Sequence, residues 1–273
     1  METVRVDFHL HTTCSDGAWA PERLLHTVHE RGLKYFSITD HDTMEAYPVP
    51  DDLQSRCIAG LEVDTYGFEQ TVHVLGYGVS PASALVSRLE AQQRERRLRA
   101  QSIIERLNAL GIDLRLDQVE SSAGSTKSIG RPHIARALVE AGHCNELQEA
   151  FDKYLADGEI AFVPLQRLWT KEAIDLIHEG GGIAVLAHPR RLRHQNLLSK
   201  ICRLFDGLEL MHPSADTNYQ HHLIELIDAH NLMATGGTDF HARPNDPMIG
   251  IPFPTGRLTR FLESIRRCEK AAL

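Results

Sequence analysis

Short apolar runs alternate with segments of helical spacing over most of the chain. Seven runs have the length and the β-branched or aromatic content of strands, and they span residues 4–10, 34–39, 57–67, 71–79, 182–187, 207–211 and 232–237. Amphipathic segments separate most of them; one begins with Pro21 and ends with Gly32, as helices commonly do. This order predicts an α/β fold, either a barrel or a doubly wound sheet, and we favour the barrel.

The pattern changes between Ser80 and Trp169. No run there resembles a strand, and a long helical pattern extends to Leu110 from Ser80 and Pro81, a predicted N-cap and first-turn pair. We therefore predict two parts. Residues 1–80 and 170–273 form the barrel domain, and residues 81–169 form a helical insertion that covers the active-site end.

Composition and charge narrow the class of protein. A formal charge of −8 argues against a broad basic surface that binds DNA, but an anionic substrate could still be held locally. Five cysteines without a CxxC spacing are typical of reduced thiols. The chain lacks an apolar run of the roughly 20 residues that cross a bilayer. It also begins without a signal-peptide pattern, so we expect a cytoplasmic protein with no membrane partner.

Residues 6–17, VDFHLHTTCSDG, carry the first sign of a chemical site. Side chains alternate between the two faces of a strand, so Asp7, His9 and His11 are expected to point the same way. A solvated surface strand could show the same pattern. However, His, Asp or Glu recurs at the ends of six predicted strands, where catalytic groups of (β/α) barrels gather. These residues are Asp7, His9, His11, Asp40, His41, Glu62, His73, His188, His212, Asp239 and His241.

Imidazoles and carboxylates without thiolates suit zinc, manganese or iron. A glutamate such as Glu62 can bridge two metals through its two oxygens. Closely spaced ions can then hold both the attacking and the departing oxygen of a displacement, and bound water supplies hydroxide near neutral pH. The pattern therefore predicts a hydrolase in which metal-activated hydroxide attacks in line.

The motifs HLHTTCSDG, TDHD, GLEVD, TVHVLGYG, AHP and GTDFH, in this order, resemble those of the polymerase and histidinol phosphatase (PHP) superfamily of metal-dependent phosphoesterases. The resemblance covers residues 4–79 and 183–250. It implies a distorted (β/α)7 barrel with a helical insertion and two or three divalent ions, with manganese expected and zinc or iron as alternatives. The implied ligands are His9, His11, Glu62 and Asp239 at one metal, Glu62, His73 and His188 at a second, and Asp16, His41 and His241 at a third.

Two further segments, SIGRPHIARALVEAG and HPSADTNYQ, are similar to the branch that includes bacterial 3′,5′-nucleotide bisphosphate phosphatases. This similarity implies removal of the 3′-phosphate from adenosine 3′,5′-bisphosphate to give AMP. Related members are 5′-to-3′ exonucleases on short RNA. The expected partner is therefore a small nucleotide, with short RNA as an alternative, and no DNA-binding surface is evident.

Other polar residues are candidates for catalysis and substrate binding. Glu62, Asp239 and His212 are the catalytic candidates; His212 would donate a proton to the leaving oxygen or stay neutral beside the ligands. Asp7 and Asp40 are expected to orient ligating histidines. The candidates for contact with substrate phosphates are Lys127, Ser128, Arg131, His133, Arg191 and His194. For Arg131 the alternative is a salt bridge at the start of a helix.

Three other functions share part of this pattern. A histidinol-phosphate phosphatase has the same metal core and differs in its substrate. A metal-dependent amidohydrolase uses a similar barrel, but it commonly has a lysine between its metals, where this chain offers Glu62. A non-catalytic domain would be expected to have lost ligands, and every expected ligand is present.

Overall fold

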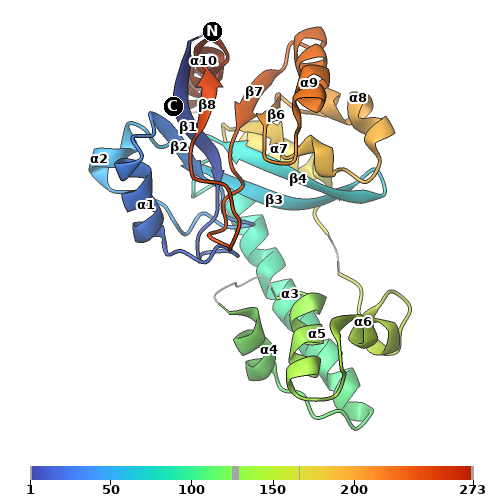
Figure 1. Ribbon diagram of the computed structural model, residues 1–273. Coiled ribbons are helices and arrows are strands. Elements are labelled where there is room, and N and C mark those ends of the chain that lie inside the picture. Colours follow the sequence, from blue (N-terminus) through green and yellow to red (C-terminus); the bar gives the residue numbers. More distant parts are fainter. Residues whose placement is uncertain (1, 125–128, 166, 272–273) are drawn as a thin grey trace. The chain divides into compact units, whose positions relative to one another are not determined.

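The computed structural model describes residues 2–124, 129–165 and 167–271. The chain divides into two units, one formed by Met1–Arg88 with Leu168–Leu273 and the other by Leu89–Arg167. The first unit contains the strands, and the second is helical (Figure 1). Among the described residues, no helix combines the length and the apolar content that a membrane span requires.

The strands of the first unit form two sheets. They are β1 (Thr3–Leu10), β2 (Tyr35–Ile38), β3 (Gly60–Gly67), β4 (Gln70–Tyr77), β5 (Ile183–Leu186), β6 (Gly207–Met211), β7 (Met233–Gly236) and β8 (Ile251–Pro254). One sheet has the order β2-β1-β8, and the other has the order β3-β4-β5-β6-β7. The pairs β1/β2, β5/β6 and β6/β7 are parallel, whereas β1/β8, β3/β4 and β4/β5 are antiparallel.

Isolated bridges join the two sheets on both sides. Leu10 of β1 bridges to Phe240, which follows β7, and His41, which follows β2, bridges to Glu62 of β3. The ends of β1, β2 and β7 therefore lie beside the start of β3. The predicted α/β class is confirmed, with the described strands arranged as two bridged sheets.

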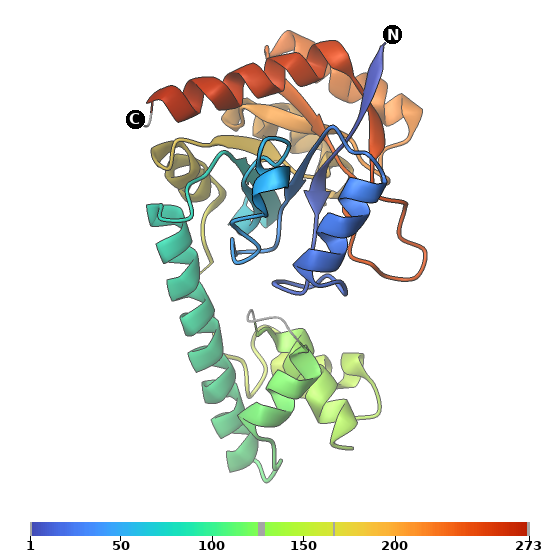
Figure 2. The same ribbon diagram turned by 90° about the vertical axis from the view of Figure 1, so that its left-hand side faces the viewer.

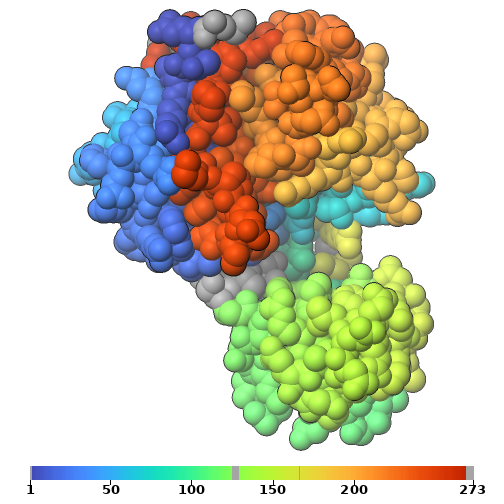
Figure 3. Space-filling view, viewed as in Figure 1, coloured from blue at the N-terminus to red at the C-terminus, as the bar shows by residue number. Residues whose placement is uncertain are grey.

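The seven predicted runs coincide with β1–β7, and the prediction missed β8. The sequence of β8, IPFP, contains Pro252 and Pro254, which have no backbone N–H and are therefore confined to sheet edges. β8 lies at such an edge, antiparallel to the first half of β1. Figure 3 shows the red C-terminal segments of the first unit against the blue N-terminal ones, as this pairing requires.

Both faces of β1 are buried from Val6 to Leu10. Phe8 packs edge-on against Tyr77 and Phe261, with ring centroids 6.4 and 5.1 Å away. Asp7 and His9, on the opposite face, have no exposed surface either. The alternation predicted from sequence thus separates an aromatic core from a buried polar face.

Helices surround the sheets of the first unit (Figure 2). They are α1 (Pro21–Glu30), α2 (Asp51–Gln54), α7 (Thr170–Glu179), α8 (Leu198–Ile201), α9 (Thr217–Ala229) and α10 (Thr255–Ala271), with short 3₁₀ helices at Pro189–Arg191, Gln195–Leu197 and Cys202–Leu204. The amphipathic α1 buries Leu24 and Val28 in a core shared with Phe36 and Phe240. That core holds the first helix against the strands that carry the polar cluster.

The helical unit lies within the predicted insertion, residues 81–169. Its elements are α3 (Ala84–Ala109), α4 (Leu116–Ala123), α5 (Arg131–Glu140), α6 (Leu147–Ala150) and a π-helical turn, Phe151–Leu155. α3 begins later than predicted, because the hydroxyl of Ser83, rather than that of Ser80, accepts a hydrogen bond from the backbone N of Val86 at 3.5 Å. The apolar side of α3 packs into a core that includes Ile103, Leu107, Leu114, Val119 and Leu138.

Candidate metal centre

Glu62 lies at the centre of the polar cluster. This residue of β3 is 1% exposed, and its two carboxylate oxygens contact different imidazoles. Oε1 lies 2.9 Å from Nδ1 of His73 and 3.0 Å from Nε2 of His188. Oε2 faces the Nε2 atoms of His9 at 3.1 Å, His11 at 3.2 Å and His41 at 3.4 Å. One carboxylate therefore contacts two separate groups of nitrogen ligands.

Asp239 divides its contacts in a similar way. Its Oδ1 lies 3.3 Å from Nε2 of both His9 and His11. Its Oδ2 accepts a hydrogen bond from Nη1 of Arg191 at 2.6 Å and lies 3.3 Å from Nε2 of His212. Oδ1 of Asp239 thus faces two imidazoles that could share a metal, whereas its Oδ2 contacts Arg191 and His212.

Asp16 repeats this arrangement on another side of the cluster. Its Oδ1 lies 3.1 Å from Nε2 of His241, and its Oδ2 accepts a hydrogen bond from Nη2 of Arg243 at 2.7 Å. Nδ1 of His241 lies 2.8 Å from the carbonyl oxygen of Asp239. Because a carbonyl only accepts hydrogen bonds, Nδ1 carries the proton and Nε2 is available to a metal.

In three groups of side chains, candidate ligand atoms lie within 4.8 Å of one another. The first group is His9, His11, Glu62 and Asp239, and the second is His11, Asp16, His41 and His241. The third is His41, Glu62 and His73. The first group is the set implied for one metal, and the second adds His11 to another implied set. In the third group His41 stands where His188 was expected, although His188 contacts the same Glu62 oxygen as His73. The fold thus brings all nine predicted ligand residues together, and their ligand roles stay predictions.

His11 provides a test of whether metal ions fit this cluster. The residue is fully buried, and neither of its ring nitrogens makes a hydrogen bond of good geometry among the described residues, although Nε2 lies 3.2 Å from Oε2 of Glu62. A buried polar atom without a partner costs about 1–3 kcal/mol, which a metal bound to the imidazole would offset. A donor set of His, Asp and Glu without Cys suits manganese, zinc or iron. The residues present therefore fit divalent ions.

Residues 7–157, more than half of the chain, match the family model of the PHP domain. The chain belongs to the PHP domain family. Its strand-end histidines lie together in the cluster, as the resemblance of the sequence to this family led us to expect.

Known relatives of this PHP chain act on phosphoesters. The 5′-3′ exoribonuclease Rnm of Escherichia coli K12 is 36% identical over 86% of this chain and 84% of its own length. The 3′,5′-nucleoside bisphosphate phosphatase of Chromobacterium violaceum is 30% identical over 87% of both chains. A structure from Bifidobacterium adolescentis, assigned as a metal-dependent phosphoesterase, superposes with a TM-score of 0.71 at 26% identity over 95% of this chain and 96% of that chain. This chain is a metal-dependent phosphoesterase of the PHP type.

Charges within the PHP cluster shift the pKa values of its members. Burial would raise the pKa of Glu62, but the charges of His41 and His9 hold it well below its usual range. Burial would lower the pKa of His11, but contacts with Asp239 and Glu62 raise it to about 9. The metal-free cluster therefore pairs the ionised Glu62 with a protonated His11, and a bound metal would replace that proton, whereas burial lowers the pKa of His41 to about 4.

Three charged residues at the cluster were missed by the sequence patterns. Glu209 of β6 is fully buried, with Oε1 2.8 Å from Nδ1 of His9. Oδ1 of Asp64 lies 2.9 Å from Nε2 of His73. The third is Arg243, whose Nη2 donates to Oδ2 of Asp16. For Glu209 the sequence holds one local signal, a carboxylate inside the apolar strand GLELM.

Asp7 and Asp40 contact backbone and hydroxyl groups rather than imidazole rings. Asp7 accepts hydrogen bonds from the backbone N of Thr238 at 3.0 Å and from its hydroxyl at 2.7 Å. Asp40 accepts hydrogen bonds from the backbone N and the hydroxyl of Thr12, at 2.7 and 2.6 Å. For Asp40 the expectation that it orients a ligating imidazole was wrong, because Thr12 and Ser15 occupy its oxygens. For Asp7 that role stays a prediction, since it also accepts a hydrogen bond from the backbone N of His9 at 3.3 Å. Both carboxylates hold in place the loops after β7 and β1, which carry cluster residues.

Two predicted residues of the first unit, His212 and Arg191, lie at the cluster through their shared contact with Asp239. Nδ1 of His212 accepts a hydrogen bond from the backbone N of Ser214 at 3.0 Å, so a neutral His212 carries its proton on Nε2. By contrast, the backbone N of His194 donates to Gln70, and no contact joins His194 to the cluster in the described part of the chain.

The other predicted substrate-binding residues belong to the helical unit or lie outside the described residues. Arg131 starts α5, where it donates to the carbonyl oxygen of Leu155 at 3.0 Å and forms a salt bridge with Asp157. Nδ1 of His133 accepts a hydrogen bond from the backbone N of Gly130 at 3.0 Å. Lys127 and Ser128 lie outside the described residues. Substrate contact by these four residues stays a prediction.

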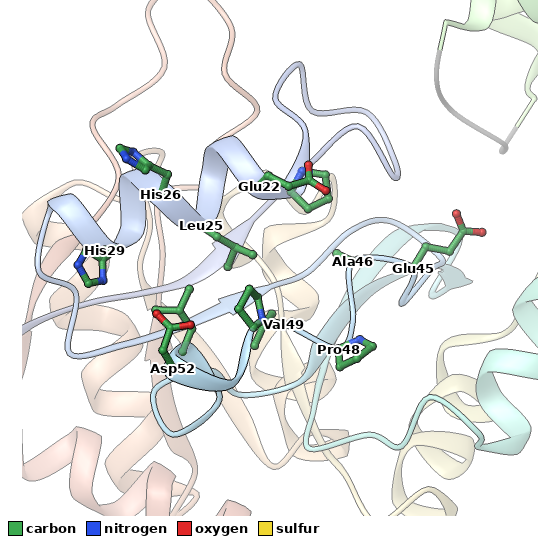
Figure 4. A pocket seen from close by; sticks show the side chains of 12 residues that line it. Glu22, Leu25, His26, His29, Glu45, Ala46, Pro48, Val49 and Asp52 are labelled. Carbon is green, nitrogen blue, oxygen red and sulfur yellow. The ribbon is translucent and has the colours of Figure 1, made fainter.

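A pocket of about 600 Å³ lies between α1 and the segment that leads into α2 (Figure 4). Leu25, Val49 and Leu53 form its apolar part, and Glu22 and His26 are among its polar lining residues. None of the residues predicted to hold metal or substrate lines it. The pocket is therefore separate from the metal centre.

Proposed function

We propose that this chain hydrolyses the bond between the 3′-oxygen and phosphorus of adenosine 3′,5′-bisphosphate and similar nucleotides, giving AMP and phosphate. The observation that carries the proposal is the division of the Glu62 carboxylate between two groups of imidazoles, since closely spaced metal sites serve displacements at phosphorus. The similarity to the Chromobacterium violaceum bisphosphate phosphatase supports this substrate.

Divalent ions, with manganese expected and zinc or iron as alternatives, would supply positive charge and an acidic water to this chemistry. Glu62 and Asp239 hold the imidazoles around the reacting phosphate. His212 in its imidazolium form would supply a proton from Nε2, which lies 3.3 Å from Oδ2 of Asp239, while its Nδ1–H donates to the hydroxyl of Ser214 at 2.7 Å. Water loses one proton to solvent, the resulting hydroxide oxygen bonds to phosphorus, the bond from phosphorus to the 3′-oxygen breaks, and that oxygen takes the proton from Nε2 of the His212 imidazolium, which becomes neutral.

Two arginines are placed to bind phosphate oxygens. The side chains of Arg191 and Arg243 are 54% and 56% exposed, and each donates to one aspartate of the cluster. A guanidinium has five N–H donors in a planar fork, so both retain donors for a ligand. A substrate with two phosphates could use both arginines.

A short 5′-phosphorylated RNA is the second candidate substrate. The E. coli exoribonuclease is 36% identical to this chain, more than the bisphosphate phosphatase. Removing the first nucleotide of such an RNA can break the same bond, between a 3′-oxygen and phosphorus beside a nucleoside with a 5′-phosphate. One site could therefore perform both reactions.

The proposal retains two further expectations from the sequence. The bridges on both sides of the two sheets support the distorted (β/α)7 barrel as the scaffold. A nucleotide substrate supports the cytoplasm as the compartment.

The experiment compares four substrates with manganese-loaded protein: adenosine 3′,5′-bisphosphate, AMP, histidinol phosphate and a short 5′-phosphorylated RNA. Phosphate release and chromatography of the products follow each reaction, with His9→Ala as the control. We expect AMP from the bisphosphate, or mononucleotides from the RNA, and loss of the activity in the control. Turnover of histidinol phosphate alone would overturn the substrate assignment, and inertness towards every phosphoester would overturn the function.

A further inference from the structure

Glu209 connects two histidines of the metal centre. It belongs to β6 and has no exposed surface. Its Oε1 lies 2.8 Å from Nδ1 of His9, and its Oε2 accepts a hydrogen bond from the backbone N of His188 at 2.6 Å. The imidazoles of His9 and His188 stack at 5.8 Å with an interplanar angle of 24°. A single buried carboxylate thus contacts both residues.

The contact with His9 determines which ring nitrogen faces the metal centre. An ionised carboxylate only accepts hydrogen bonds, so Nδ1 of His9 must carry a proton. The lone pair available to a metal is then on Nε2. That atom lies 3.1 Å from Oε2 of Glu62 and 3.3 Å from Oδ1 of Asp239.

The contact of Glu209 with the backbone N of His188 stabilises an unusual backbone conformation at His188. His188 has φ 27° and ψ 64°, in a region that non-glycine residues rarely adopt, and Pro189 follows it. The hydrogen bond from its backbone N to Glu209 supports this turn. The turn brings Nε2 of His188 to 3.0 Å from Oε1 of Glu62.

We infer that Glu209 is a positioning residue of the metal centre: it aims Nε2 of His9 and Nε2 of His188 at opposite oxygens of Glu62. The role of Glu209 concerns metal binding and does not depend on which phosphoester is the substrate.

The variant Glu209→Gln tests this role, because an amide cannot accept hydrogen bonds from both partners. If its oxygen accepts from His188, its NH₂ faces Nδ1 of His9 and moves the proton of the neutral ring to Nε2. If its oxygen accepts from His9, its NH₂ opposes the backbone N–H of His188. In either orientation one histidine is lost as a ligand. We expect manganese affinity to fall by about 10- to 100-fold, the usual effect of losing such a partner.

The matched control is Asp206→Asn, which removes a carboxylate of the first unit that also contacts an imidazole and a backbone N, those of His178 and Ala184, outside the metal centre. The readouts are manganese affinity and stoichiometry, together with ¹⁵N NMR of the His9 ring in zinc-loaded protein. We expect Nδ1–H with zinc on Nε2 in the wild type and in Asp206→Asn, and loss of this state or of the His188 signal of bound imidazole in Glu209→Gln.

Wild-type affinity and the wild-type His9 spectrum in folded Glu209→Gln would overturn the inference. If that variant does not fold, the zinc-loaded wild type still decides, because a proton on Nε2 of His9 would overturn the assignment. A wild type that binds neither metal would instead refute the proposed function.

Discussion

Nε2 of His188 lies 3.0 Å from Oε1 of Glu62, although 126 positions separate the two residues in the sequence. The other oxygen of Glu62 faces His9 and His11. This division explains why one glutamate could serve two metals: each oxygen already has its own imidazoles.

Replacing Glu62 by Gln would remove one of the two shared oxygens and leave an NH₂ donor against imidazole nitrogens. We expect the loss of at least one bound metal ion per chain, measured by elemental analysis. Loss of a residue that hydrogen-bonds to a metal ligand lowers activity by up to about 100-fold. Because Glu62 would itself be a ligand, the rate of phosphoester hydrolysis should fall further than that. The control is Glu69→Gln, an exposed residue between β3 and β4. Full metal content in Glu62→Gln would contradict the shared-ligand role.

Metal binding should release protons. The pKa of His11 is raised to about 9 in the metal-free protein, and those of His9 and His73 are also raised above their usual range. These imidazoles are protonated at neutral pH, whereas a ligand must be neutral. Apparent manganese affinity should therefore rise as the pH increases from 6 to 9. Titration calorimetry in buffers with different ionisation enthalpies measures the protons released, and an affinity independent of pH would refute this account.

Gly237 allows the close approach of the chain after β7 to β1. A Cβ there would lie 2.4 Å from Cβ of His9 and 2.9 Å from Oδ1 of Asp7. Gly237→Ala should displace His9, weaken metal binding and lower the free energy of unfolding by about 1–3 kcal/mol. The control is Gly256→Ala, where a Cβ meets nothing within 4 Å. Denaturant unfolding and metal titration measure the stability and the metal affinity of both variants. Equal values for Gly237→Ala and Gly256→Ala would contradict the prediction.

Arg191 should contribute to substrate binding through its remaining donors. Arg191→Gln is expected to raise KM for a nucleotide bisphosphate by about 10- to 100-fold, since a charge-assisted hydrogen bond is worth about 1.5–3 kcal/mol. Arg193→Gln removes the same charge from another exposed position of this segment and should leave KM unchanged. The comparison of the two variants distinguishes direct contact with substrate from a general loss of positive charge. Equal KM values for the two variants would show that Arg191 does not contact the substrate.

Local patterns predicted the strands and most of the cluster. Alternation placed Asp7, His9 and His11 on one face of β1, because that periodicity is a property of each strand by itself. The rule that catalytic groups gather at strand ends then collected residues as distant as His73 and Asp239. Neither inference needed a knowledge of tertiary contacts.

The missed features depend on contacts that no local pattern records. Glu209 reaches His9 across 200 positions, and Arg243 reaches Asp16 across 227. The role expected of Asp40 was wrong for the same reason: sequence shows a carboxylate beside His41, but only the fold shows that Thr12 occupies it. Pairing at the edge of β1 likewise made a strand of IPFP, whose prolines argue against one.

The central claim is that the residues around Glu62 hold two or three divalent ions. Anomalous diffraction from crystals of the manganese-loaded protein, recorded on both sides of the manganese absorption edge, tests it most directly. The account predicts at least two manganese peaks, one beside each oxygen of Glu62. The absence of any peak within the cluster in fully loaded crystals would contradict it.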